Sequence, residues 1–290
     1  MRLDELVAQG SARLEAAAVA FGHGTHNAHD EAAWLTLWRL GLPLDTDLTT
    51  APTIGADGVA AVQALIDERI ARRLPAAYLT GEAWLQGVPF FADARAIVPR
   101  SLIAEPLAEM LFDAYLPDGQ AGDARVLDLC TGNGSLAVLA ALAWPHARVD
   151  AIELSATALA LARRNVERHG VAERVRLIEG DGIERMDGRY DLILCNPPYV
   201  NAASMAALPA EFRAEPELAL AGGADGMDFV RRLIAGAPRH LRPEGALVLE
   251  IGHERAHFEA AFPHLNPLWL ETSAGQESVL LLHTSDFPPP

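Results

Sequence analysis

One stretch of this sequence decides the fold: Val126-Leu127-Asp128-Leu129-Cys130-Thr131-Gly132-Asn133-Gly134-Ser135. It runs from an apolar segment into a glycine turn, and an apolar segment with helical character, Ser135–Trp144, follows. Glycines in such a turn let the backbone approach a ligand without a Cβ in the way. A strand, a glycine turn and a helix in this order indicate a unit that binds a nucleotide-like ligand.

The chain after this stretch continues to alternate between strand and helix patterns. An alternation of this kind predicts an α/β fold with a mostly parallel sheet covered on both faces. The last two strands have only a short connection, so we expect them to form an antiparallel hairpin at one edge. The expected strands are Arg125–Cys130, Arg148–Leu154, Arg174–Glu179, Asp191–Cys195, Ala246–Ile251, Pro267–Glu271 and Glu277–His283, and the helices are Ser135–Trp144, Ala156–His169 and Gly226–His240.

The chain before this stretch has a different character. Apolar residues recur at helical spacing in the first 75 residues, which predicts a bundle of helices, one of them capped by Asp30. Two strand-like segments, Tyr78–Thr80 and Ala83–Leu85, precede a turn at Gly87-Val88-Pro89 and indicate a β-hairpin. We therefore divide the chain into a helical domain (1–75), a hairpin linker (76–100) and a sheet domain (101–290).

Charge and composition restrict the partners. The 290 residues carry 39 acidic and 23 basic side chains, for a net charge of -16. Such a protein suits a basic partner and disfavours DNA. No apolar run reaches the roughly 18 residues of a membrane span, and the N-terminus lacks the pattern of a signal peptide. We expect a cytoplasmic protein without a membrane partner.

The glycine turn by itself is compatible with two cofactors. Gly132, Gly134 and Ala137 satisfy the fingerprint of dinucleotide-binding proteins, and Glu153 follows where an acid would bind a ribose in either case. Asp128 favours S-adenosylmethionine over a nicotinamide dinucleotide. A carboxylate here would repel a pyrophosphate, whereas it can receive a cationic amine.

The strongest motif is Asn196-Pro197-Pro198-Tyr199, which follows the Asp191–Cys195 strand. Two prolines remove two backbone donors and leave carbonyls as acceptors. The turn offers the Asn196 side-chain oxygen and the Pro197 carbonyl to a planar group that bears NH2, with Tyr199 as a flat surface beside it. Holding such a group in line with a methyl donor can lower the activation free energy by roughly 7–11 kcal/mol, and no general base is needed. We predict that Asn196, Pro197 and Tyr199 are catalytic and bind the substrate together with Pro198.

Both motifs resemble those of known enzymes. Asp128–Gly134 resembles motif one of the class I methyltransferases, and Asn-Pro-Pro-Tyr resembles the amino methyltransferases, which methylate glutamine amides, adenine or cytosine. The resemblance implies a Rossmann-like sheet, with S-adenosylmethionine as cofactor and S-adenosylhomocysteine as product. It also implies that Glu153 binds the ribose hydroxyls and that Asp181 binds the adenine amino group. The full set of cofactor-binding residues it implies is Asp128, Cys130, Thr131, Gly132, Gly134, Glu153, Asp181 and Asn196.

The whole chain is similar to the protein-glutamine N5-methyltransferases of the HemK/PrmC and PrmB kind. Phe21–Thr25, Val98–Ser101 and Leu127–Gly132 place it closest to the PrmB branch, which modifies a glutamine of ribosomal protein three of the large subunit. The release-factor branch typically has Gly in place of Cys130, and glutamine methylation of release factors is the first alternative. The acidic balance disfavours a nucleic-acid methyltransferase, and the intact Asn-Pro-Pro-Tyr disfavours a non-catalytic scaffold that binds S-adenosylmethionine. A glutamine side chain alone is too small to identify a target protein, and the N-terminal residues carry no cofactor motif, so we expect the helical domain to recognise the acceptor protein.

Other polar residues give weaker signals. Three histidines share a loop without a nearby cysteine, so we expect no metal site: His23, His26 and His29. Cys130 and Cys195 are expected to be small residues at the ends of neighbouring strands. Arg100, Glu105 and Glu250 are the remaining candidates for ligand contacts.

Overall fold

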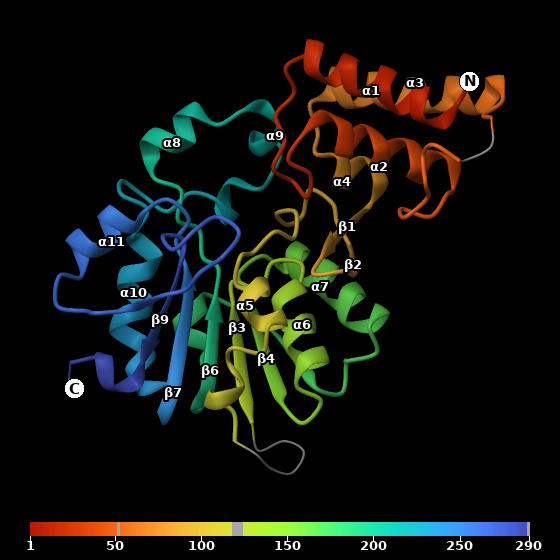
Figure 1. Ribbon diagram of the computed structural model, residues 1–290. Helices are drawn as coiled ribbons and strands as arrows, with labels where there is room; N and C mark the ends of the chain where they lie inside the picture. The colour runs from red at the N-terminus through yellow and green to blue at the C-terminus, as the bar shows by residue number, and fades with distance from the viewer. Residues whose placement is uncertain (51–52, 118–123, 289–290) are drawn as a thin grey trace.

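A computed structural model describes residues 1–50, 53–117 and 124–288. The chain forms a helical N-terminal domain, a β-hairpin and an α/β domain (Figure 1). The strands are β1 (Glu82–Leu85), β2 (Val88–Phe91), β3 (Arg125–Leu129), β4 (Arg148–Glu153), β5 (Val175–Glu179), β6 (Tyr190–Cys195), β7 (Leu241–Glu250), β8 (Leu268–Trp269) and β9 (Val279–His283). The α-helices are α1 (Leu3–Ala16), α2 (Ala28–Leu40), α3 (Ala56–Arg72), α4 (Ala76–Thr80), α5 (Ala104–Ala108), α6 (Ser135–Ala143), α7 (Ala156–Arg168), α8 (Ala202–Ala207), α9 (Ala210–Arg213), α10 (Asp228–Gly236) and α11 (Arg255–Ala261).

The large sheet has the predicted topology. Within the described residues it contains seven strands in the order β5-β4-β3-β6-β7-β9-β8. The first five run parallel, whereas β9 is antiparallel to both β7 and β8. The antiparallel hairpin expected at the sheet edge is therefore confirmed.

Alternating side chains of the strands face two different helical layers. Val126 of β3 joins the core under α5 and α6, and its neighbour Leu127 joins the core under α10 and α11. Both layers are visible on either side of the sheet in Figure 1. Because successive residues of a strand point to opposite faces, an apolar run such as β3 is what a sheet buried on both sides requires.

The hairpin region differs from the prediction in two respects. Tyr78–Thr80 was expected to be a strand, but these residues belong to α4, because the Tyr78 amide donates to the Pro75 carbonyl and Gly81 ends the turn in a left-handed conformation. Val88 and Pro89 lie in β2, and the hairpin turns at Gln86-Gly87.

The cap of α2 also differs from the prediction. Asn27, rather than Asp30, caps this helix by accepting a hydrogen bond from the Asp30 amide. A capping residue must precede the helix, so that its side chain can accept a hydrogen bond from the amide three positions further along. Asp30 lies inside the helix and supplies that amide. Across the described part of the chain, no helix is long and apolar enough to span a bilayer.

The strand order places a crevice next to β3. The chain crosses from β3 to β4 on one side and later returns to β6 on the other side, so the loops after β3 and β6 part from each other. Ligands of open α/β sheets bind at this kind of reversal, beyond the carboxyl ends of the strands. Both sequence motifs, the glycine turn and Asn196–Tyr199, lie at this edge.

Candidate active site

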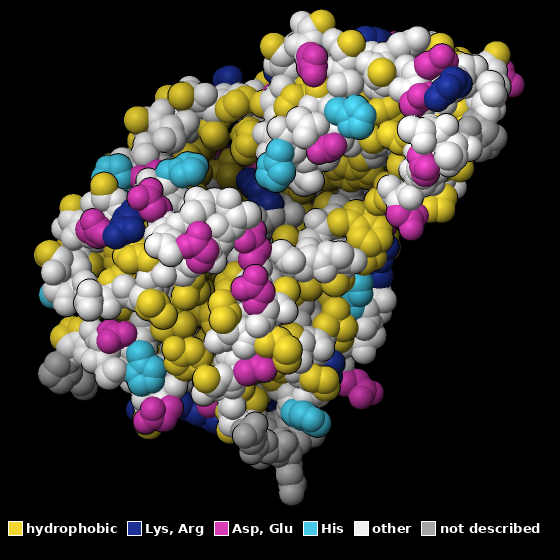
Figure 2. All heavy atoms as spheres, in the orientation of Figure 1, with side chains coloured by type: hydrophobic (Ala, Val, Ile, Leu, Met, Phe, Trp, Pro, Cys, Tyr) yellow, Lys and Arg dark blue, Asp and Glu magenta, His cyan; other side chains and the backbone are white. Residues whose placement is uncertain are grey.

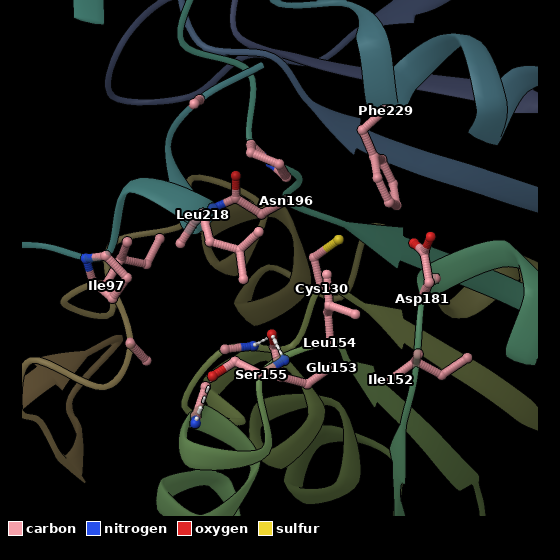
Figure 3. Close-up of a pocket in the computed structure, with 18 of the residues that line it drawn as sticks. Ile97, Cys130, Ile152, Glu153, Leu154, Ser155, Asp181, Asn196, Leu218 and Phe229 are labelled. Carbon is pink, nitrogen blue, oxygen red and sulfur yellow. Dashed lines mark hydrogen bonds between the residues drawn. The ribbon is translucent and has the colours of Figure 1, made fainter. Parts of the chain in front are cut away.

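A cavity of about 600 Å³ opens at the carboxyl ends of β3, β4, β5 and β6 (Figure 3). Five of the predicted cofactor-binding residues line it: Cys130, Gly132, Glu153, Asp181 and Asn196. Pro198, predicted to bind the substrate, lines it as well. The cavity also extends beyond the predicted sheet domain, because Arg95, Ala96 and Ile97 of the hairpin linker lie in its lining.

The floor of the cavity consists of the loops that follow β3, β4 and β5. Glu153 connects the loop after β3 to the loop after β4. Its carboxylate accepts hydrogen bonds from the amides of Gly132 and Ser155, each 2.9 Å long. Figure 3 shows Glu153 beside Ser155 at the base of the cavity. The carboxylate is thus oriented by backbone donors and remains part of the cavity lining.

Asp128 lies behind the glycine turn and outside the cavity lining. Its Oδ2 accepts hydrogen bonds from the Thr131 hydroxyl and from the Ala137 amide, so it ties the turn to the start of α6. Its Oδ1 is buried and has no partner among the described residues. Burial raises the pKa of this carboxyl to about 7, and the hydrogen bonds from Thr131 and Ala137 offset only part of that effect.

The two glycines of the turn have different neighbours. Gly132 faces the cavity with a φ of +57°, a conformation that favours glycine. Gly134 lies away from the cavity, and a Cβ there would stand 3.1 Å from Cβ of Ala162 in α7. Gly134 therefore permits close packing of the turn on α7. Cys130 also has a left-handed backbone, with a φ of +62°.

The far end of the cavity holds an acid, a cation and an aromatic ring. Asp181 forms an ion pair with Arg232, whose Nη2 lies 2.9 Å from Oδ2, and both side chains are partly exposed. Phe229 of α10 points toward Asp181 in Figure 3 and packs against Gly182, where a Cβ would lie 3.0 Å from the ring. This end of the cavity suits a flat ring that carries a hydrogen-bond donor.

Asn196 enters the cavity from the end of β6 (Figure 3). Its side chain forms no hydrogen bond to any part of the chain that the structure describes, so its amide is available to a ligand. Tyr199 is fixed instead: its hydroxyl donates to Glu250 at 3.2 Å. Burial, followed by the nearby Glu250, raises the pKa of Tyr199, which keeps that hydroxyl protonated as a donor.

Curated relatives match nearly the whole chain. The ribosomal protein uL3 glutamine methyltransferase of Bordetella pertussis is 54% identical over 282 residues, which covers 97% of this chain and 94% of the relative. The ribosomal protein uL3 glutamine methyltransferase of Burkholderia pseudomallei is 52% identical, with coverage of 98% and 95%. The chain belongs to the ribosomal protein uL3 glutamine methyltransferase family. The resemblance predicted from the sequence and the predicted enzyme class, a glutamine methyltransferase, are therefore confirmed.

Two further comparisons agree with the fold of this family. The model of the methyltransferase small domain matches residues 108–223. The hMettl16 catalytic domain, solved in complex with the MAT2A 3'UTR hairpin 6, superimposes with a TM-score of 0.52 at 15% identity and covers 82% of this chain and 86% of that chain. This likeness concerns the fold alone and confirms the class I methyltransferase architecture.

One side of the cavity in this family member was not predicted from the sequence. We call residues 199–222 the wall segment, since part of it (Pro216, Glu217, Leu218, Ala219 and Ala221) lines the cavity. The buried carboxylate of Glu215 pairs with Arg100, with N–O distances of 2.5 and 2.7 Å, and accepts the Val98 amide at 2.8 Å. Although burial alone would raise the pKa of Glu215, Arg100 and His23 lower it to about 2.

The floor also contains a polar residue that was not predicted. Asn165 of α7 is fully buried, accepts the Phe91 amide at 2.7 Å and donates to the Asn133 carbonyl at 2.9 Å. It therefore joins β2 to the glycine turn. A lone asparagine within a helical pattern carries no local signal of such a role, because both of its partners are distant in the sequence.

The remaining candidates lie apart from the cavity. His23 is buried against Phe212, with ring centroids 4.1 Å apart, whereas His26 and His29 are exposed, so the three histidines do not converge. Glu105 accepts hydrogen bonds from Ser273 in the loop after β8. Arg100 and Glu250 contact the wall segment rather than the cavity, through Glu215 and Tyr199. The two cysteines lie together, since β3 and β6 pair at Leu129 and Cys195.

Proposed function

We propose that this protein transfers a methyl group from S-adenosylmethionine to the side-chain amide nitrogen of a glutamine in ribosomal protein uL3. The observation that carries the proposal is the meeting of Glu153, Asp181 and the unpaired Asn196 amide around one cavity. Membership of the family supports the choice of acceptor over release factors.

The residues of the cavity fit S-adenosylmethionine. Glu153 presents a carboxylate where two ribose hydroxyls can donate to it, and Asp181 beside Phe229 suits an adenine ring with its amino group. The buried, unpaired Oδ1 of Asp128 disfavours a pyrophosphate behind the turn and favours a cation. When bound, S-adenosylmethionine supplies an electrophilic methyl group on a sulfonium.

The Asn-Pro-Pro-Tyr turn would orient the acceptor amide. The Asn196 side-chain oxygen and the Pro197 carbonyl are the acceptors for its two N–H groups, which holds the nitrogen in one plane and favours positive charge on it as it is methylated. Tyr199 forms the adjoining surface, and its hydrogen bond to Glu250 keeps the ring in place. The proton can leave the nitrogen after the methyl group has arrived, so the chain needs no strong base.

The acceptor protein needs a wider binding surface than one glutamine side chain. A second cavity of about 320 Å³ lies between α2 and the hairpin, lined by Trp34, Leu37, Leu44 and Trp84 and by the single charged side chain of Asp30. Leu44 and Trp84 are more than two-fifths exposed. Figure 2 shows hydrophobic side chains gathered in the hollow below the N-terminal helices. This groove fits an apolar side chain flanked by arginine or lysine, which supports the helical domain as the recognition domain for a basic acceptor.

The proposal is tested by methyl transfer to several acceptors in parallel. Tritiated S-adenosylmethionine is incubated with the protein and purified uL3, a release factor or DNA, and we expect label only in uL3, on a glutamine.

Because the protein is acidic, kcat/KM on a basic acceptor should fall with added salt. Trp84→Ala should raise KM for uL3 and leave the affinity for the cofactor unchanged. Label in the release factor or DNA but not in uL3 would reject the proposed acceptor.

A further inference from the structure

The wall segment contacts the N-terminal domain through a second buried carboxylate, Glu211. Arg73 and Arg69 of the α3 region both approach it: Nε of Arg73 lies 2.6 Å and Nη1 of Arg69 lies 3.2 Å from Oε1. The side chains of Glu211 and Arg69 are fully buried. The wall segment and the N-terminal domain are therefore joined by an ion pair that water does not screen.

Arg69 is held from the other side by its own domain. Its Nε donates to Glu31 of α2 at 2.8 Å, and its Nη2 donates to the Ala20 carbonyl at 2.9 Å. The three contacts use the three different nitrogens of one planar guanidinium, which fixes its position. Arg69 thus presents a rigid cation to the wall segment.

Apolar contacts support the same junction. Phe212 packs against the buried ring of His23 with the two ring planes tilted by 45°, and a Cβ at Gly22 would be 3.2 Å from the Phe212 ring. Only two residues separate Phe212 from Glu215, and Pro216 then begins the part of the segment that lines the cofactor cavity. The position of the lining is therefore set within a few residues of the junction.

Besides this junction, the wall segment is held by Glu215, which binds Arg100 and Val98. Tyr199 and Asn201 at its start donate to Glu250 and Glu254. α9 comprises only four residues, Ala210–Arg213. The lining part is tied to the turn after β6 by two backbone hydrogen bonds, from the Val200 amide to the Leu220 carbonyl at 2.8 Å and from the Gly222 amide to the Val200 carbonyl at 2.9 Å. A displaced wall would therefore disturb both the cofactor cavity and the Asn196–Tyr199 turn.

We propose that the N-terminal domain fixes the wall of the cofactor cavity through the Arg69–Glu211 pair, so that both side chains are positioning residues for methyl transfer. This inference rests on the proposed function, because it assumes that the cavity holds S-adenosylmethionine. It gives the helical domain a second role besides recognition of the acceptor. Residues that never touch the cofactor then control its affinity.

The test compares two buried acids, Glu211 in the wall segment and Asp150 in β4. Glu211→Ala removes the contact of the wall segment with Arg69 and Arg73 and leaves Arg69 paired with Glu31. Asp150→Asn is the control, because Asp150 is also a buried carboxylate paired with two arginines, Arg125 at 2.6 Å and Arg176 at 2.8 Å, and it is not part of the cavity lining. S-Adenosylmethionine binding is measured by calorimetry on the full-length proteins, and thermal unfolding gives the loss of stability in each.

We expect Glu211→Ala to weaken cofactor binding about tenfold or more, because small displacements of positioning residues have large effects. Asp150→Asn should leave the dissociation constant within about twofold of wild type, even if it loses as much stability. Glu211→Gln, which retains the size and one acceptor oxygen, should lie between wild type and Glu211→Ala. It also provides the measurement if the alanine variant does not fold.

Hydrogen exchange gives a readout that a general loss of stability would not produce. The amides of Val200 and Gly222 should exchange faster in Glu211→Ala than in Asp150→Asn. A dissociation constant within about twofold of wild type in both Glu211 variants, while wild type binds the cofactor, would overturn this inference alone. A wild-type protein that binds no S-adenosylmethionine would overturn the proposed function with it.

Discussion

The floor and the wall of the proposed cofactor cavity are held by different kinds of contact. In the floor, Glu153 binds the amide of Gly132, 21 positions away, and that of Ser155, two positions away. In the wall, Glu215 and Glu211 pair with arginines 115 and 142 positions away. The loops of the floor are therefore held mainly within the sheet domain, with one link to β2 through Asn165. The wall depends on how three parts of the chain are assembled.

The difference extends to the response to pH. Burial raises the pKa of Asp128 in the floor to about 7, since no cation among the described residues faces it. In the wall, Arg100 and His23 overcome the effect of burial and lower the pKa of Glu215 to about 2. Near neutral pH the floor changes its charge and the wall does not, which offers a way to examine them separately.

The largest effect is expected where floor and wall meet, at Asn196. Asn196→Ala removes the proposed acceptor for the glutamine amide and should lower kcat by about 10²–10³, while the dissociation constant for S-adenosylmethionine changes little. Methyl transfer to uL3 and calorimetry measure the two quantities. Asn266→Ala is the control, since Asn266 is exposed and lies outside the cavity lining. More than about a tenth of the wild-type rate in Asn196→Ala, a loss below roughly 1.4 kcal/mol, would reject the amide clamp.

The next effect concerns the floor alone. Glu153→Ala should weaken S-adenosylmethionine binding by about 1.5–3 kcal/mol for each charged hydrogen bond lost, and it should lower the melting temperature because the Gly132 and Ser155 amides lose their acceptor. Glu179→Ala is a matched control, because Glu179 pairs with Glu153 in register but is exposed and outside the cavity lining. Equal dissociation constants for the two variants would contradict the assignment.

A smaller effect should appear in the pH dependence of the floor. A bound cation favours the carboxylate form of Asp128, so cofactor affinity should rise by up to about tenfold from pH 6 to pH 8. Stability of the free protein should follow the opposite course. The pKa of Asp128 is about 7 in the folded protein and ordinarily 3.8, so the folded state holds this proton more tightly than the unfolded state. The resulting stability is fully present below pH 3.8 and is lost as the pH rises through about 7. Asp128→Asn should flatten both profiles; unchanged slopes in this variant would assign the titration to another group.

The smallest effect is expected from the backbone of the glycine turn. Cys130→Gly relieves a left-handed conformation but adds chain entropy to the unfolded state, so the free energy of unfolding should change by less than about 1 kcal/mol. Gly132→Ala places a side chain on a left-handed backbone and should cost about 1–2 kcal/mol of unfolding free energy. No steric clash adds to this cost, because the nearest atom to the new Cβ is 3.9 Å away. Denaturant titration of both variants measures this. A large loss in Cys130→Gly would mean that the thiol has a role of its own.

The sequence by itself determined where the motifs of the floor meet, although not the link that Asn165 makes to β2. Strand ends, glycine turns and the Asn-Pro-Pro-Tyr turn are local patterns, and parallel strands bring their carboxyl ends to one edge of a sheet whatever surrounds them. For this reason Gly132, Glu153 and Asn196 were predicted from local patterns, and the resemblance added Asp181; all four line one cavity. The antiparallel hairpin at the sheet edge was predictable for a similar reason, from the length of one connection.

Only the tertiary structure decided which residues form the wall of the cavity. It also decided that Gly134 packs on α7, that Tyr78–Thr80 are helical, and that Ile97 lines the cavity. Gly134 shows why: its small size serves contact with Ala162, which no spacing in the glycine turn reveals. Arg69 and Glu211 are 142 positions apart, and in the sequence each looks like a charged residue on a helix surface. They become buried partners because the N-terminal domain packs on the segment after β6, and the free energy of a buried ion pair exists only once both charges have left water together.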